Sequence, residues 1–175
     1  MTLIIALVFL VACSAFFSAS ETAFSSLNQI RLKSRAEDGD ASAARVLAMA
    51  EKYDKLLSTI LIGNNIVNIA AASIGTILFT RALGAERGAT MSTIVLTIVV
   101  LIFGEVTPKS LAKEMPETVA TAVSPMLNLL MVLFTPLTWL FSQWKRLLGH
   151  FVHSTEEDTI TECELMTMVS EAEND

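Results

Sequence analysis

The chain has 175 residues, of which 53% are hydrophobic and 17% charged, and its formal net charge is −6. An ordinary soluble domain is less apolar and carries about 25% charged residues. The acidic excess lies in residues 156–175, and no basic stripe with interleaved aromatic residues runs along the chain, which argues against nucleic-acid binding. We therefore expect a single all-α domain embedded in membrane lipid.

The first apolar segment, residues 3–27, is long enough to predict a membrane helix. The alternative is a secretory signal core over residues 3–17, with a lipoprotein-like box that ends at Cys13. Signal peptides normally begin with a positive region, whereas this chain begins Met-Thr-Leu without Lys or Arg. We therefore favour a retained span.

Polar residues interrupt this span in the motif FFSASETAFSS. Ser18, Glu21 and Ser25 follow i, i+3, i+7 spacing, which places them on one face of a helix. A carboxylate within a membrane span is expensive, so its default interpretation is a functional role facing the protein interior. Serines alone would indicate only close helix packing.

The connection over residues 31–55 contains six basic residues, whereas the connection over residues 81–87 contains two. The positive-inside rule therefore predicts a cytoplasmic first connection and an N-terminus outside. An Ala-rich run within residues 34–53 predicts one or two short cytoplasmic helices.

The second predicted span, residues 56–80, contains the motif GNNIVN. Asn64 and Asn68 are four residues apart and share a helix face, while Asn65 is turned away from them. The alternative role for these amides is hydrogen bonding between helices.

The third predicted span, residues 90–107, runs into the motif FGEVTPK. Pro108 has no N–H, so we expect the carbonyl of Gly104, four residues earlier, to lose its helical partner. A free carbonyl beside Glu105 would be a good ligand for a hard cation. The alternative is a simple proline-kinked helix end with Glu105 at the membrane interface.

A fourth apolar run covers residues 119–141 and contains Pro125 and Pro136. Basic residues flank it on both sides, so we expect a re-entrant or juxtamembrane helix broken by proline at the cytoplasmic interface. A full fourth span is the alternative.

Counting 1.5 Å per residue, we estimate that Ser18, Asn64 and Glu105 lie at roughly 18–22 Å below the outer face of the membrane. A layer of carboxylate, amide, hydroxyl and carbonyl oxygens without sulfur or imidazole suits Mg²⁺, Ca²⁺ or Na⁺. This chemistry does not distinguish Mg²⁺ from Na⁺.

The three motifs, in this order and spacing, resemble the transmembrane domain of the CorC family, bacterial relatives of the cyclin M magnesium transporters. The likeness covers residues 1–150, and residues 151–175 are similar to the linker toward the family's cytoplasmic CBS-pair domain, so we expect a truncated membrane domain. The chain has Ala19 where many relatives have Gly.

The resemblance implies a homodimer in the cell inner membrane that exports Mg²⁺, with Na⁺ as the expected exchanged ion and with ATP binding only in the CBS-pair domain. The family's metal-site pattern falls on Ser18, Asn64, Asn68, Gly104 and Glu105, with Glu21 and Ser25 as further members. A Mg²⁺-sensing membrane anchor that does not conduct is the alternative function. We do not expect an enzyme, because the sequence has no Ser/His/Asp set, HExxH motif or phosphate-binding Gly loop.

Overall fold

The computed structural model describes residues 1–140 and 143, and those residues contain helices and connections but no strand. The chain divides into two compact units, Met1–Thr138 and Trp139–Asp175, and the fold described below is that of the first unit. The expected linker at residues 151–175 lies outside the described residues.

The first unit contains seven α-helices and one π-helical segment. In chain order they are α1 (Thr2–Ser25), α2 (Gln29–Glu37), α3 (Ala41–Ala50), α4 (Tyr53–Leu83), α5 (Ala85–Val99), η1 (Val100–Val106), α6 (Thr107–Glu114) and α7 (Pro116–Leu133). The prediction of an all-α membrane protein is confirmed.

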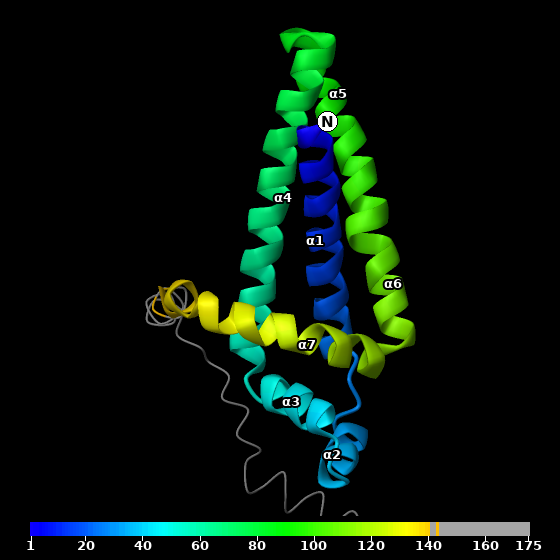
Figure 1. Ribbon diagram of the computed structural model, residues 1–175, viewed down its shortest axis with the longest axis vertical. Coiled ribbons are helices and arrows are strands. Elements are labelled where there is room, and N and C mark those ends of the chain that lie inside the picture. The colour runs from blue at the N-terminus through cyan, green and yellow to red at the C-terminus, as the bar shows by residue number, and fades with distance from the viewer. Residues whose placement is uncertain (141–142, 144–175) are drawn as a thin grey trace, which may run out of the picture. The chain divides into compact units, whose positions relative to one another are not determined.

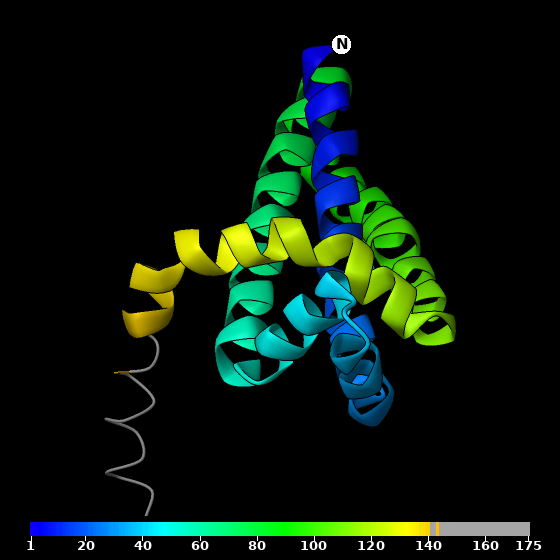
Figure 2. The same cartoon turned by 60° about the horizontal axis from the view of Figure 1, so that its bottom comes forward.

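Four helical runs are long and apolar enough to cross a membrane, namely Thr2–Ser25, Tyr53–Leu83, Ala85–Glu114 and Pro116–Leu133. The first three stand side by side as a bundle, whereas α7 lies crosswise over that bundle (Figures 1 and 2). Large apolar side chains such as Phe9, Ile69 and Phe103 are exposed on the bundle, which suits contact with lipid. The crosswise position of α7 fits the juxtamembrane role that the sequence predicts for it.

Pro125 lies inside α7 and does not end the helix. Its missing N–H would leave the carbonyl of Thr121, four residues earlier, without a helical donor. The hydroxyl of Ser124 donates to that carbonyl over 3.0 Å. The helix therefore continues to Leu133, just before Pro136.

A tight turn joins α4 to α5. Gly84 makes this turn with a φ of +84°, a conformation that L side chains rarely adopt. The expected connection over residues 81–87 is therefore a single residue between two long helices. Just beyond this turn, a Cβ on Gly88 would lie 2.5 Å from the Thr80 Cα. The backbones of α4 and α5 therefore touch at this point.

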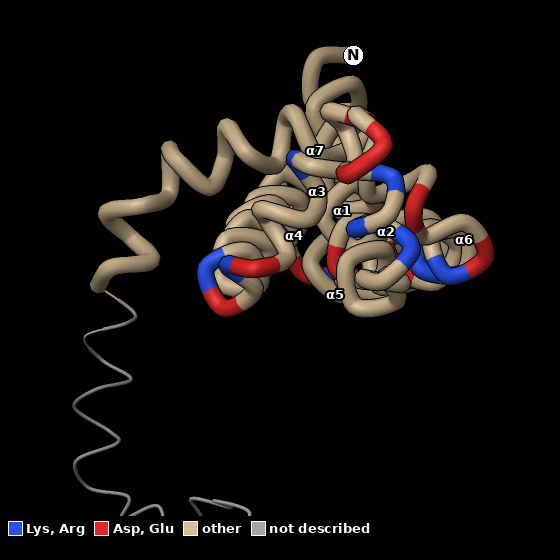
Figure 3. Tube along the Cα trace, turned by 90° about the horizontal axis from the view of Figure 1, so that it is seen from below, with Lys and Arg blue, Asp and Glu red and all other residues tan. Residues whose placement is uncertain are grey.

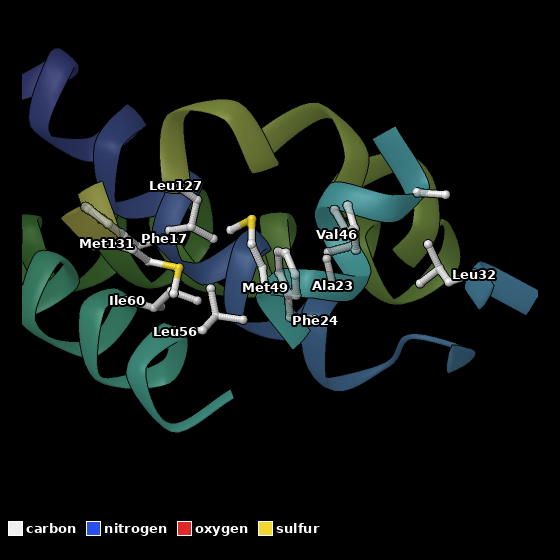
Figure 4. Packing of buried hydrophobic residues seen from close by; sticks show 13 residues of the cluster. Phe17, Ala23, Phe24, Leu32, Val46, Met49, Leu56, Ile60, Leu127 and Met131 are labelled. Atoms are coloured by element: carbon white, nitrogen blue, oxygen red, sulfur yellow. The ribbon is translucent and has the colours of Figure 1, made fainter. Parts of the chain in front are cut away.

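The largest apolar core lies where α1, α3, α4 and α7 meet. Phe17 of α1 and Ile60 of α4 pack there with Leu127 and Met131 of α7 (Figure 4). The ring of Phe17 takes the space that a side chain at residue 63 would fill, because a Cβ on Gly63 would lie 2.2 Å from its Cζ. The core therefore holds α7 against the bundle.

Figure 3 shows the protein from below relative to Figure 1. Charged residues gather there around α2, the start of α4 and the turn between α6 and α7. Arg35 of α2 donates to Asp40 over 2.7 Å and to Glu117 over 3.2 Å. Asp40 also caps α3, because its carboxylate accepts from the backbone N–H groups of Ser42 and Ala43. These bonds tie α2, α3 and α7 together.

The Asp40 carboxylate offers a test of this arrangement by pH. The backbone N–H of Ala43 and the guanidinium of Arg35 hold the pKa of Asp40 below its usual value. A carboxylate with a lowered folded-state pKa stabilises the protein above its ordinary pKa, and that stability is lost as the pH falls through the lowered value. We expect Asp40→Asn to melt a few degrees below the parent at pH 7, and we expect the difference to shrink as the pH falls from the ordinary aspartate pKa of about 3.9 through the lowered folded-state pKa. A difference that persists unchanged in acid would contradict this account.

Candidate functional site

A serine of α1 links the two asparagines that the sequence places on one face of α4. The hydroxyl oxygen of Ser14 lies 2.9 Å from the Asn68 side-chain oxygen and 3.2 Å from that of Asn64. Ser14 is completely buried, and both amide oxygens converge on its single hydroxyl proton. Two amide oxygens that point to one place are the kind of arrangement that can ligate a cation.

Gly104 approaches the same serine from the third helical run. A Cβ on Gly104 would lie 3.0 Å from the Ser14 hydroxyl oxygen, so a side chain there would push Ser14 aside and glycine lets η1 pack closely on α1. The predicted residues Asn64, Asn68 and Gly104 are thus brought together around Ser14.

Pro108 stands where the π-helical register of η1 gives way to α6. Thr107 still donates its backbone N–H to the carbonyl of Ile102, five residues earlier. Counted in the α-helical register of α6, the missing N–H of Pro108 corresponds to the carbonyl of Gly104, and counted in the register of η1 it corresponds to that of Phe103. Gly104 remains a predicted ligand because of its place beside Ser14 and its family position.

Glu105 lies with Asn68 along one cavity. The cavity has a volume of about 330 Å³ and lies between α4 and the run formed by α5 and η1. Glu105 is partly buried, and it brings a carboxylate to the same cavity as an amide from the Ser14 cluster. These two helical runs therefore supply the anionic and neutral oxygens of the candidate site.

Ser18 lies one turn along α1 from Ser14 and does not hydrogen-bond to the asparagines. Its side chain is 1% exposed, and its hydroxyl has no hydrogen-bond partner within the described part of the chain. A buried hydroxyl without a partner is rare and suits a position that an ion or water completes. Ser18 stays a predicted ligand, although the residue level with the amides is Ser14.

The structure does not bring Glu21 and Ser25 to the amide cluster. Glu21 forms an ion pair with Lys109 of α6 at 3.1 Å. Ser25 is exposed and donates to the carbonyl of Thr22 in its own helix. Asn65 is also exposed and donates to the Leu61 carbonyl. It points away from Asn64 and Asn68, as the sequence predicts.

The donor chemistry fits a hard cation. Among residues 1–140 and 143, no group of three or more His, Cys, Asp or Glu side chains could hold a metal ion. Hydroxyl, amide, carbonyl and carboxylate oxygens remain, which are the ligands that Mg²⁺, Ca²⁺ and Na⁺ prefer. Glu21 is paired to Lys109, whereas Glu105 lines the same cavity as the Asn68 amide. One carboxylate favours weak binding, which a transported ion requires for release.

Comparison with known proteins gives the chain a family. The family model described as the cyclin M transmembrane N-terminal domain matches residues 5–175. The inner membrane protein YfjD of Escherichia coli K12 is 42% identical over 163 residues, which cover 91% of this chain and 38% of that protein. A UPF0053 protein of Haemophilus influenzae is 39% identical over 174 residues, or 98% of this chain and 41% of that protein.

A protein of Haemophilus influenzae named polyamine export protein is 29% identical over 150 residues, which cover 79% of this chain and 35% of that protein. The chain therefore spans about two fifths of the length of the relatives that it matches.

Proposed function

The chain belongs to the cyclin M transmembrane-domain family, and from this premise we propose that it moves Mg²⁺ across the inner membrane. The observation that carries the proposal is the convergence of the Asn64 and Asn68 oxygens on buried Ser14, directly beside Gly104. Polar groups at this depth of an apolar bundle are costly unless they serve an ion or a partner.

The amides act as neutral ligands and Glu105 supplies charge. Mg²⁺ gives up its water reluctantly, so a site of few protein oxygens and several retained waters suits it. The chain does no chemistry on its cargo, and Na⁺ moving the other way would supply the driving force. We propose a homodimer with the N-terminus outside, in which a CBS-pair domain that binds ATP regulates transport.

The test is Mg²⁺ flux in liposomes that contain the purified protein and a Mg²⁺-sensitive dye. Asn64→Ala, Asn68→Ala and Glu105→Ala are each expected to lower the initial rate several-fold, because each removes one oxygen from the site. Asn65→Ala is the matched control, since that amide lies on the same helix and donates only to the Leu61 carbonyl. It should transport like the parent.

Equal flux through the parent and the three site variants would show that the ion does not pass these residues. Parent protein that binds Mg²⁺ but carries no flux under any gradient would favour the non-conducting sensor. Each variant is first checked for a folded state by its thermal melting curve.

An organic polycation is the second candidate cargo. Relatives named polyamine export protein suggest it, and the cavity of about 330 Å³ is much larger than a bare metal ion. Its lining joins the Glu105 carboxylate, the Asn68 amide and apolar side chains such as Leu96, which would suit an ammonium group and an alkyl chain. Uptake of labelled spermidine without Mg²⁺ flux, lost in Glu105→Ala, would favour this cargo.

A further inference from the structure

A row of polar residues continues from the candidate site along the cavity between α4 and α5. On α4 the lining runs from Asn68 to Thr76, and on the opposite run it extends from Glu105 back to Ser92. Since α4 and α5 are antiparallel, Thr76 and Ser92 lie at the end of the cavity nearer the Gly84 turn. The polar row covers about 12 Å along α4.

The hydroxyls in this row present oxygen lone pairs. Thr76 donates its proton to the Ala72 carbonyl and Thr93 donates to the Ala89 carbonyl, each within its own helix. A hydroxyl that has given away its proton can still accept from water or coordinate a cation. The polar part of this open and mostly apolar cavity therefore offers acceptors, which suit a hydrated positive ion.

Ser92 provides an independent sign that the row serves a ligand. It is 1% exposed, lines the cavity, and its hydroxyl has no hydrogen-bond partner among the described residues. A Cβ on Gly75 would lie 3.2 Å from this hydroxyl oxygen, so a glycine on α4 makes room beside it. Burying an unpartnered hydroxyl in a membrane bundle has a cost that a wet passage would remove.

We infer that this hydroxyl-lined cavity is the passage by which a hydrated divalent cation travels between the Asn68–Glu105 site and the membrane face at the α4–α5 turn. The inference rests on the proposed function. At about 30 Å³ per water, the cavity has room for about ten waters, enough for a cation with its inner shell. Between Thr76 and the end of α4 at Leu83, about 10 Å remain to that face, and because the backbones of the two helices touch at Thr80 and Gly88, the ion covers this distance beside the α4–α5 pair and not between the helices.

Thiol labelling tests the passage without depending on transport. Cys13 and Cys163 are first replaced by Ala and Ser, and single cysteines are then introduced as Thr93→Cys and Thr97→Cys in the cavity lining. Ile94→Cys and Ile98→Cys are matched controls, because both isoleucines are about half exposed on the same helix but do not line the cavity.

A charged, membrane-impermeant methanethiosulfonate is applied from the side of the α4–α5 turn. Thiols react as thiolates, which form in water and not in lipid. Thr97→Cys and Thr93→Cys should therefore react at least about tenfold faster than Ile98→Cys and Ile94→Cys, and millimolar Mg²⁺ should slow them. Threonine-site cysteines that react no faster than the isoleucine-site cysteines would overturn the passage.

A flux measurement separates this inference from the proposed function. Ser92→Ala should lower Mg²⁺ flux. The Mg²⁺ affinity of the Asn68–Glu105 site should stay unchanged, because the substitution alters the passage and not the binding residues. Parent liposomes without Mg²⁺ flux would reject the proposed cargo, and the labelling contrast would still report whether the cavity is a wet passage. Reduced affinity in Ser92→Ala would overturn its assignment to the route.

Discussion

Replacing Gly88 with alanine is expected to destabilise the α4–α5 pair strongly. A glycine inside a helix normally costs about 1 kcal/mol relative to alanine, so this change would ordinarily stabilise the protein. At Gly88 the added Cβ would meet three backbone atoms, namely the Cα and N of Thr80 at 2.5 and 2.6 Å and the carbonyl oxygen of Phe79 at 2.7 Å. Backbone atoms have no rotamer in which to move aside, so the two helices must separate.

We expect a net loss at the upper end of overpacking costs, about 3 kcal/mol, seen as a lower melting temperature in detergent. Ala89→Val is the matched control, since it adds two methyl groups at an exposed neighbouring position of the same helix. Mg²⁺ flux should fall with Gly88→Ala as well, because the cavity lies between the helices that this contact joins. A melting temperature equal to the parent would mean that the close approach of the two backbones is not maintained in solution.

The sequence predicts the three-span bundle because each span is a long apolar run bounded by charges. The sequence also predicts that α7 lies at the membrane interface, since basic residues flank that apolar run on both sides. Exact helix ends are harder to predict: the expected connection at residues 81–87 is only Gly84, because its positive φ lets two helices meet without a loop. Pro125 does not interrupt α7, because the Ser124 hydroxyl supplies the donor that proline lacks.

The candidate site is only partly readable from the sequence. Asn64 and Asn68 face the same place, as four-residue spacing predicts, but their common partner is Ser14 and not Ser18. Ser14 could have been found by extending the Ser18 face by one turn toward the N-terminus. The π-helical register of η1, which ends just before Pro108, has no signal in the sequence.

Ser14→Ala is expected to weaken Mg²⁺ binding more than the loss of either asparagine. The Ser14 hydroxyl orients both amide oxygens, so without it two predicted ligands lose their fixed orientation. Each asparagine substitution removes one ligand. Loss of such an orienting partner typically lowers metal affinity by about 10- to 100-fold. Calorimetric titration of the detergent-solubilised protein with MgCl₂ measures the affinity, and the flux assay measures the consequence for transport.

Ser20→Ala is the matched control for Ser14→Ala. Ser20 is equally buried in α1, but its hydroxyl donates over 2.7 Å to the Phe16 carbonyl of its own helix. Both changes remove one buried hydroxyl from the same helix, so they differ mainly in whether the amides lose their partner. Equal Mg²⁺ affinity in the two variants would show that Ser14 holds helices together without shaping the site. A loss confined to Ser14→Ala would indicate that the two amides need the orientation that the Ser14 hydroxyl gives them in order to bind the ion.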